Sequence, residues 1–145
     1  VPKFPRPMIH SKDFDFSFSG LKTAVLYLVR DLEQQDIDIK KLRPVICKEF
    51  QDAVVEVLVA KTIRAAKKFK VKTILLGGGV AANTQLRDNL AKAIKSNFLN
   101  TSYFIPNTFL TGDNALMIAV AAMRRAKQAK KSTWKTLQPD ANMRL

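Results

Sequence analysis

The stretch GGGVAAN at positions 77–83 decides how the second half of the chain folds, because it joins an apolar segment at 73–76 to an amphipathic segment that begins after Asn83. This order predicts a strand, a tight turn and a helix. Gly77, Gly78 and Gly79 permit positive φ and leave no Cβ in the way of a ligand. Asn83 can cap the helix and offer its side-chain amide beside the same opening. Taken alone, these residues fit a ligand-binding loop and a plain strand-to-helix turn equally well, and they match neither G-x-G-x-x-G nor the G-K-[ST] phosphate loop.

Outward from this turn, the second half of the chain alternates strand and helix. Strands are predicted at 72–76 and 102–105, and helices at 84–96 and 113–128. This order implies a right-handed crossover between two parallel strands. Upstream, apolar residues at helical spacing predict one helix from 21 to about 35, a short polar connection that contains Pro44, and the longest helix from 45 to about 69.

Before the first helix, the sequence DFDFSF at 13–18 alternates polar and aromatic residues. This period predicts a half-buried strand, and it places Phe14, Phe16 and Phe18 in the core before it suggests base stacking.

The predicted fold class is α/β, helix-rich with a small, partly parallel sheet. The chain divides into an extended lead-in (1–12), a strand and helical part (13–70), a β-α-β-α part (71–131) and a polar tail (132–145). Two clear strands and one doubtful strand are too few for a complete doubly wound fold. We therefore expect a single C-terminal lobe or fragment whose partner strands lie upstream.

Charge is the strongest feature of the composition. The 145 residues include 25 Lys and Arg against 12 Asp and Glu, a net charge of +13. Polyanions are the natural partners of such a chain, and contact with nucleic acid through phosphates is the favoured interpretation. Solvated cations at helix C-termini would explain the same pattern. The basic residues form two clusters: Lys61, Arg64, Lys67, Lys68, Lys70 and Lys72, and then Arg124, Arg125, Lys127, Lys130, Lys131 and Lys135.

The remaining composition describes a soluble globular protein, with 47% hydrophobic residues and a mean hydropathy of -0.08. No apolar run approaches the roughly 20 residues of a membrane helix, so no membrane partner is expected. The single cysteine, Cys47, cannot form an internal disulfide or anchor a structural zinc site, and it reads as a small apolar residue on a helix. A cytoplasmic location is expected, or an organellar one if the full-length protein carries a transit peptide.

Five motifs in order carry a resemblance to a known family. They are FPRP at 4–7, DFSFSGLKTAV at 15–25, FQDAVVEVL at 50–58, GGGVAANTQLR at 77–87 and GDNALMIA at 112–119. Together they resemble the C-terminal portion of the tRNA threonylcarbamoyladenosine transferase family, once labelled O-sialoglycoprotein endopeptidase. The resemblance implies part of the second lobe of the two-lobed actin-like fold, which sugar kinases and heat-shock ATPases share.

The resemblance also implies a reaction. A threonylcarbamoyl group would pass from an adenylate to the exocyclic amine of an adenosine beside the tRNA anticodon. The adenosine moiety of the adenylate would lie against Gly77, Gly78 and Gly79, with Asn83 as the polar contact. No catalytic residue is assigned. The implied partners are tRNA, the first lobe and other subunits of the threonylcarbamoylation machinery.

By the same resemblance, Asp113 would be one ligand of a divalent metal ion, iron or zinc, whose other ligands are two histidines of an upstream H-x-x-x-H helix. From the residues alone, Asp113 reads as a first-turn acid that stabilises a helix N-terminus. The family segment has Cys-Thr where this chain has Thr111 and Gly112, so the loop before Asp113 departs from the family pattern. The only histidine is His10, so no H-x-x-x-H exists here. We therefore expect the chain alone to bind metal weakly and to show no turnover.

Three further expectations concern surfaces. An apolar face should be exposed where the first lobe would sit, and it could drive dimerisation of the isolated chain. Lys22 is expected to be a surface lysine at a helix start. For Arg87, a solvated partner at i, i+4 is preferred to an anion contact.

Other functions stay open. A basic RNA-binding module without catalysis would explain the charge but not the ordered motifs. A metal-dependent glycoprotein endopeptidase has little physical support, because the sequence has no H-E-x-x-H, no Ser-His pair and no activating neighbour for Cys47. A different actin-like ATPase or sugar kinase lobe is compatible with the fold alone.

Overall fold

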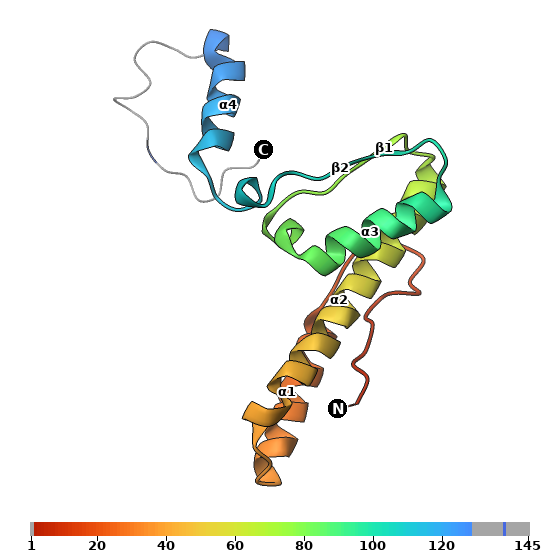
Figure 1. The fold of residues 1–145 in the computed structure, drawn as a ribbon, viewed down its shortest axis with the longest axis vertical. Helices are drawn as coiled ribbons and strands as arrows, with labels where there is room; N and C mark the ends of the chain where they lie inside the picture. Colours follow the sequence, from red (N-terminus) through yellow and green to blue (C-terminus); the bar gives the residue numbers. More distant parts are fainter. Residues whose placement is uncertain (1, 129–137, 139–145) are drawn as a thin grey trace.

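Helices dominate the structure, a computed structural model that describes residues 2–128 and 138. A two-stranded parallel sheet accompanies them (Figure 1). The fold class is therefore α/β, as predicted, and it agrees with a portion of an actin-like fold. In chain order the elements are α1 (Ser19–Gln34), α2 (Ile39–Phe69), β1 (Thr73–Leu75), the 3₁₀ turn η1 (Gly79–Ala82), α3 (Thr84–Asn97), β2 (Ser102–Phe104), η2 (Thr108–Leu110), α4 (Ala115–Arg125) and η3 (Ala126–Gln128).

The crossover predicted around the glycines is confirmed. β1 and β2 run parallel, with Ile74 opposite Tyr103 at the centre of the register, and α3 connects them. Apolar residues of α2, β1 and α3 form one core beneath the sheet, because α3 places apolar side chains at helical spacing on the face that meets α2. The buried members of this core are Ile63, Ala66, Ile74, Leu90 and Ile94.

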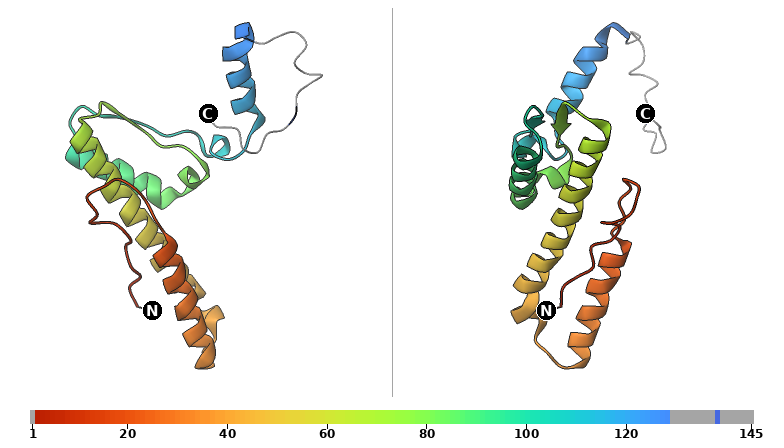
Figure 2. Two further views of the ribbon diagram at one scale, coloured as in Figure 1. Left: turned by 180° about the vertical axis from the view of Figure 1, so that it is seen from behind. Right: turned by 90° about the vertical axis from the view of Figure 1, so that its right-hand side faces the viewer.

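α1 and the first half of α2 form an antiparallel hairpin around a second core (Figure 2). The predicted connection before α2 is wrong in length, because α2 begins at Ile39 and includes Pro44. Asp38 starts the helix early, since its side chain accepts a hydrogen bond from Lys40 N at 3.0 Å. Pro44 lies in the second turn, where it removes one backbone bond without ending the helix. The buried members of this second core are Phe4, Leu21, Ile46 and Ala53.

The strand predicted at 13–18 is not formed, and this prediction is wrong. The backbone carbonyl of Asp15 accepts from Lys61 Nζ, and that of Asp13 accepts from Arg64 at 3.0 Å. Cationic side chains of α2 thus satisfy backbone groups that a neighbouring strand would otherwise pair. Phe16 is 47% exposed, so its assignment to the core is also wrong. The two flanking phenylalanines, Phe14 and Phe18, are half-buried as the alternation predicted.

Ion pairs hold the N-terminal segment (residues 2–18) along α2. Arg6 contacts Glu49 at 2.5 Å and Glu56 at 2.7 Å. Lys61 has 1% of its surface exposed and donates to Ser11 Oγ at 2.8 Å and to Asp13 Oδ1 at 3.2 Å. The first basic cluster is therefore not uniformly solvated, because Lys61 is a buried anchor of this segment.

One face of the two-stranded sheet is exposed to solvent. Ile74 and Tyr103 pack on the core, and because side chains alternate along a strand, Leu75 and Phe104 point the other way. Leu75 is 75% exposed and Phe104 59%. α4 likewise buries none of its residues. The predicted exposed apolar surface is thus present, and what covers it stays a prediction.

Among the described residues, no helix is both long and apolar enough to cross a membrane. The predicted polar tail at 132–145 lies outside the described residues except for Gln138.

Candidate functional site

Two segments follow the carboxyl ends of the parallel strands, and we take them together as the candidate site, although their residues line separate hollows. The glycine turn (residues 77–83) follows β1, and the 105–114 loop follows β2 (Figure 1). In open α/β sheets the crevice beyond the carboxyl ends of the strands is where ligands bind. The predicted site residues Asn83 and Asp113 fall one on each segment.

Within the glycine turn, only Gly78 has a positive φ, of 82°. The positive φ that the three glycines permit is therefore used at Gly78 alone. A Cβ added at Gly77 or Gly79 would meet no atom within 4 Å. These two positions are open to solvent, so a ligand could approach their backbone closely.

Asn83 caps α3, as predicted: its Oδ1 accepts from Leu86 N at 2.9 Å. Its Nδ2 donates to Gln51 Oε1 of α2 at 3.2 Å. Gln51 in turn contacts Gln85, and Gln85 donates to Asp52 Oδ1 at 2.6 Å. This chain of amides locks the Asn83 side chain between two helices.

Hydrogen bonds from Lys48 and then from Gln85 hold the pKa of Asp52 below its ordinary value, so the carboxylate stays charged within this network. Sequence reasoning missed Gln51, Gln85 and Asp52. The available signal was a polar Gln51–Asp52 pair inside the apolar stripe of α2.

An apolar cavity of about 850 Å³ opens between α1, α2 and the glycine turn. Most of its walls are aliphatic or aromatic, and Asn83 and Gln51 are its polar groups. Small-molecule sites have this size and this mixture of apolar walls with a few placed polar groups. Cys47 of α2 also lines the cavity and is exposed, so the reactivity of its thiol can report whether the cavity is occupied. Its apolar lining includes Phe18, Val25, Phe50, Leu58 and Val80.

Arg87 joins the two segments of the site. Its Nε donates to the carbonyl of Ala81 in the glycine turn, and its Nη2 donates to Pro106 O at 2.9 Å. The predicted role as a solvated i, i+4 partner is wrong, because both carbonyls lie on loops and Arg87 is half-buried between them. Lys22, by contrast, is exposed as predicted.

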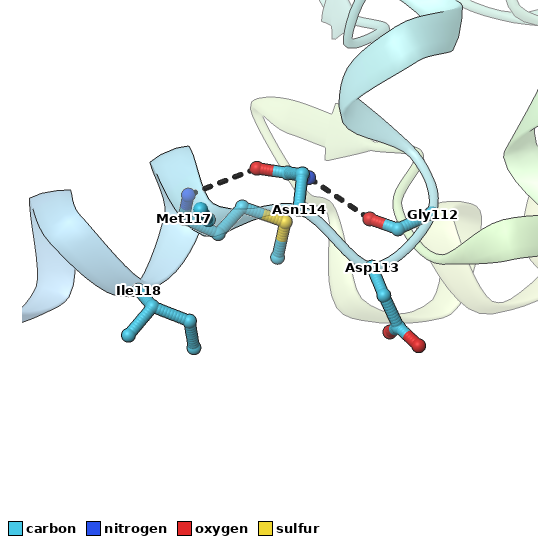
Figure 3. A pocket seen from close by; sticks show the side chains of 6 residues that line it. Gly112, Asp113, Asn114, Met117 and Ile118 are labelled. Carbon is cyan, nitrogen blue, oxygen red and sulfur yellow. Dashed lines mark hydrogen bonds between the residues drawn. The ribbon is translucent and has the colours of Figure 1, made fainter.

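Asp113 is exposed and precedes α4, and its carboxylate points away from the helix cap (Figure 3). Asn114 is the cap: its Oδ1 accepts from Met117 N at 2.9 Å, and its Nδ2 donates to Gly112 O at 2.9 Å. Asp113 is therefore not a first-turn acid, which corrects the alternative explanation for this residue. An open hollow of about 460 Å³ lies beside it, lined also by Ile118.

Metal ligands do not gather around Asp113 within the described part of the chain. Residues 2–128 and 138 contain no group of three or more His, Cys, Asp or Glu side chains that could hold an ion. A single exposed carboxylate suits one position around a hard or borderline cation. The other ligands would have to come from elsewhere.

Comparison with known proteins decides the family. A family model described as tRNA N6-adenosine threonylcarbamoyltransferase matches residues 2–120. The chain belongs to this family. A tRNA N6-adenosine threonylcarbamoyltransferase of Thermosipho africanus is 43% identical over 98% of the chain, and one of Listeria monocytogenes is 45% identical over 89%. One of Bordetella petrii is 46% identical over 85% of the chain.

The chain spans only about two fifths of these relatives: 41% of the Thermosipho protein and 37% of the Listeria protein. The activity in their names therefore describes the relatives, and for this chain it is a proposal. Adenylate and metal binding, a further lobe, additional subunits and a cytoplasmic location likewise stay predictions.

Proposed function

We propose that this chain supplies the adenylate-binding part of a tRNA N6-adenosine threonylcarbamoyltransferase. The observation that carries the proposal is the glycine turn, which opens beside an apolar cavity of about 850 Å³ and presents a fixed asparagine amide there. A cavity of this kind suits a nucleoside, and membership in the family supplies the reaction.

In this proposal the purine or ribose lies against the backbone of Gly77 and Gly79, where no Cβ intervenes. Phe50 and Val80 provide apolar walls. An asparagine amide has two N–H donors, and Asn83 uses one on Gln51, so the other is available to the ligand. Because Asn83 is held by α2 and α3, it orients the ligand without first losing side-chain freedom.

The 105–114 loop would present Asp113 to the same ligand from the end of β2. Its carboxylate would hold a divalent cation, iron or zinc, together with ligands from outside this chain. When bound, that ion would neutralise negative charge on the carbonyl and phosphate oxygens of the adenylate. Arg87 keeps the two segments at a fixed separation through Ala81 and Pro106.

The transfer itself is an attack of the adenosine amine of tRNA on the carbonyl carbon of the mixed anhydride. The new C–N bond replaces the bond to the phosphate oxygen, and AMP leaves with that oxygen. The chain contributes position and orientation to this step. No described side chain is assigned as the proton acceptor.

Cys47 provides a direct test of the nucleotide site because it is the only cysteine. AMP, a stable stand-in for the adenylate, should slow maleimide labelling of Cys47. Gly79→Ala should weaken this protection without loss of folding, since the new methyl group meets no protein atom within 4 Å. Gly20→Ala, equally unobstructed but at the start of α1, is the control. Labelling that is insensitive to AMP would refute the site.

The transferase reaction can be tested by completing the protein. A fusion of this chain to the unmatched part of the Thermosipho africanus relative should threonylcarbamoylate tRNA when supplied with the adenylate. Asp113→Asn should abolish transfer, whereas Asp88→Asn on α3 should not. We expect no transfer by the chain alone, and detectable transfer by it would overturn that expectation.

A basic RNA-binding module without catalysis is the second candidate, favoured by the net charge of +13. Salt-dependent tRNA binding combined with no response of Cys47 to AMP would select it over the transferase.

A further inference from the structure

One stretch of the chain carries many basic side chains and no acidic ones of its own. Residues 57–87 contain no Asp or Glu and carry five Lys and two Arg. Lys61, Arg64 and Arg87 are engaged in contacts with the protein's own carbonyl groups. The other four lysines are exposed around the C-terminal end of α2 and the turn into β1, and they form no ion pair among the residues that the structure describes: Lys67, Lys68, Lys70 and Lys72.

An aromatic pair lies among these lysines. The rings of Phe14 and Phe69 are 5.5 Å apart and tilted by 57°. Lys68 Nζ lies 5.1 Å from the centre of the Phe14 ring and 5.8 Å from that of Phe69. Phe69 is nevertheless 63% exposed, and a hollow of about 280 Å³ lies beside it. A large aromatic ring is thus held in place and left open to solvent next to four cations.

We propose that this surface, the Phe69 surface (Phe14, Lys67, Lys68, Phe69, Lys70 and Lys72), binds an unpaired segment of RNA. One base stacks on the exposed ring of Phe69, and the lysines contact the phosphates on either side. Proteins that hold single strands combine these two elements, since every base has a face that stacks and every nucleotide carries a charge. Positioned by Phe14, the ring loses little freedom when a base binds.

The chemistry favours RNA over a protein partner. Lysine is depleted in the cores of protein–protein interfaces, because burying its ammonium group without a carboxylate is costly. The stretch 57–87 itself offers no carboxylate, and neither Asp13 nor Asp15, which flank Phe14, forms an ion pair with the four exposed lysines among the residues that the structure describes. Phosphates of RNA supply the missing negative charge and release counterions when they bind.

The location gives the contact a role. Lys72 directly precedes β1, whereas the glycine turn follows it, so the Phe69 surface lies at the opposite end of the strand from the candidate site. It therefore binds RNA away from the reacting adenosine and serves to position the strand. The inference rests on the proposed function in one respect, that the RNA is a tRNA substrate.

The lysines can be tested with the full 145-residue chain and a fluorescent unstructured oligoribonucleotide. In anisotropy titrations, the double variant Lys68→Gln/Lys72→Gln should bind more weakly and reduce the salt slope by about 1.4, two phosphate contacts at about 0.7 each. Lys40→Gln/Lys41→Gln removes the same charge from exposed positions at the other end of α2. This control should bind like the parent chain.

Stacking is tested by changing only the ring. Phe69→Leu keeps apolar bulk against Phe14 but removes the aromatic face, and it should lower affinity by about fivefold or more. Phe69→Trp should restore it. Thermal unfolding followed by circular dichroism shows whether each variant is folded.

The outcomes separate this inference from the proposed function. If both double variants weakened RNA binding equally, or if Phe69→Leu bound RNA like the parent chain, only unspecific charge attraction would remain. Either result would overturn the proposal that the Phe69 surface binds RNA. The unmatched part of the Thermosipho africanus relative could instead bury Phe69 in the fusion and abolish RNA binding. That result would make Phe69 a protein contact, and it would also overturn the inference. Loss of AMP protection at Cys47 with RNA binding intact would instead overturn the adenylate site alone.

Discussion

The two segments of the candidate site differ in how firmly this chain holds them. Asn83 and Arg87 tie the glycine turn to α2 and to the neighbouring loop, and the helix behind it buries Leu90 in the core. The 105–114 loop leads into α4, whose cap Asn114 bonds only to nearby residues and which buries none of its side chains.

This difference shows which part of the site the chain specifies by itself. Burial of apolar side chains stabilises folded structure, whereas a helix whose apolar residues stay in water gains little from its own hydrogen bonds. The geometry of the glycine turn is thus fixed by packing within this chain. The geometry of the Asp113 segment is fixed only by local bonds and by Arg87.

Truncation of one apolar side chain on α3 and one on α4 should give the largest contrast between the two segments. Leu90 is 3% exposed on α3 and Ile118 is 72% exposed on α4. Leu90→Ala should lower the free energy of unfolding by about 2–5 kcal/mol through lost burial and a cavity. Ile118→Ala should change it by less than about 0.5 kcal/mol. Urea unfolding followed by circular dichroism measures both, and similar losses would show that α4 is packed as firmly as α3.

Glycine replacement should give the next largest contrast. Gly78 has a φ of 82° and a ψ of 171°, a region that side chains other than hydrogen rarely occupy. Gly78→Ala should therefore cost about 1–3 kcal/mol. Gly112 has no positive φ and open space around it, so Gly112→Ala should be neutral or slightly stabilising. A costly Gly112→Ala would indicate that the 105–114 loop is as constrained as the glycine turn.

The parts of the fold that sequence could predict are those with local causes. Asn83 lies three residues before the amide that it caps, and the apolar spacing of α3 is visible within a single window. The helix predicted at 113–128 likewise has a local signal, and it appears as α4. Parallel pairing of β1 and β2 followed from the order strand, helix, strand along the chain.

The failures at 13–18 and at Arg87 have distant causes. Alternation at 13–18 has the same period whether the segment pairs with a strand or lies over a helix, and Lys61, 46 residues from Asp15, decides between them. Burial of Lys61 follows from those same partners. Arg87 bonds to Pro106, 19 residues away, so its role depends on the return of β2 beside β1. None of these partners can be read from neighbouring residues.

Removal of the two helix caps should give a smaller contrast. The two variants should differ mainly in how much of the molecule each one destabilises. Asn83→Ala loses a cap and the bond to Gln51, and it should lower the free energy of global unfolding by about 1 kcal/mol. Asn114→Ala loses a cap of similar strength, but the loss should appear only as faster amide exchange within α4. Slower global unfolding of either variant, or exchange that rises throughout the core in Asn114→Ala, would contradict this division.

The smallest effect should come from acid, which should loosen the contact between the N-terminal segment and α2. Arg6 donates to the Glu49 carboxylate, and this hydrogen bond, together with that from Phe4 N, holds the pKa of Glu49 below its ordinary 4.5. Because the folded state favours the charged form, the stabilisation is complete at neutral pH and is lost as the pH falls below 4.5 through the lower folded pKa. Glu49→Gln should therefore be less stable than the parent at about pH 7 and lose less stability by about pH 3. Water and salt screen this partly exposed pair, so the difference should be small and should shrink further in high salt. Glu33→Gln on α1, whose side chain is exposed and forms no ion pair among residues 2–128, should retain the acid sensitivity of the parent chain.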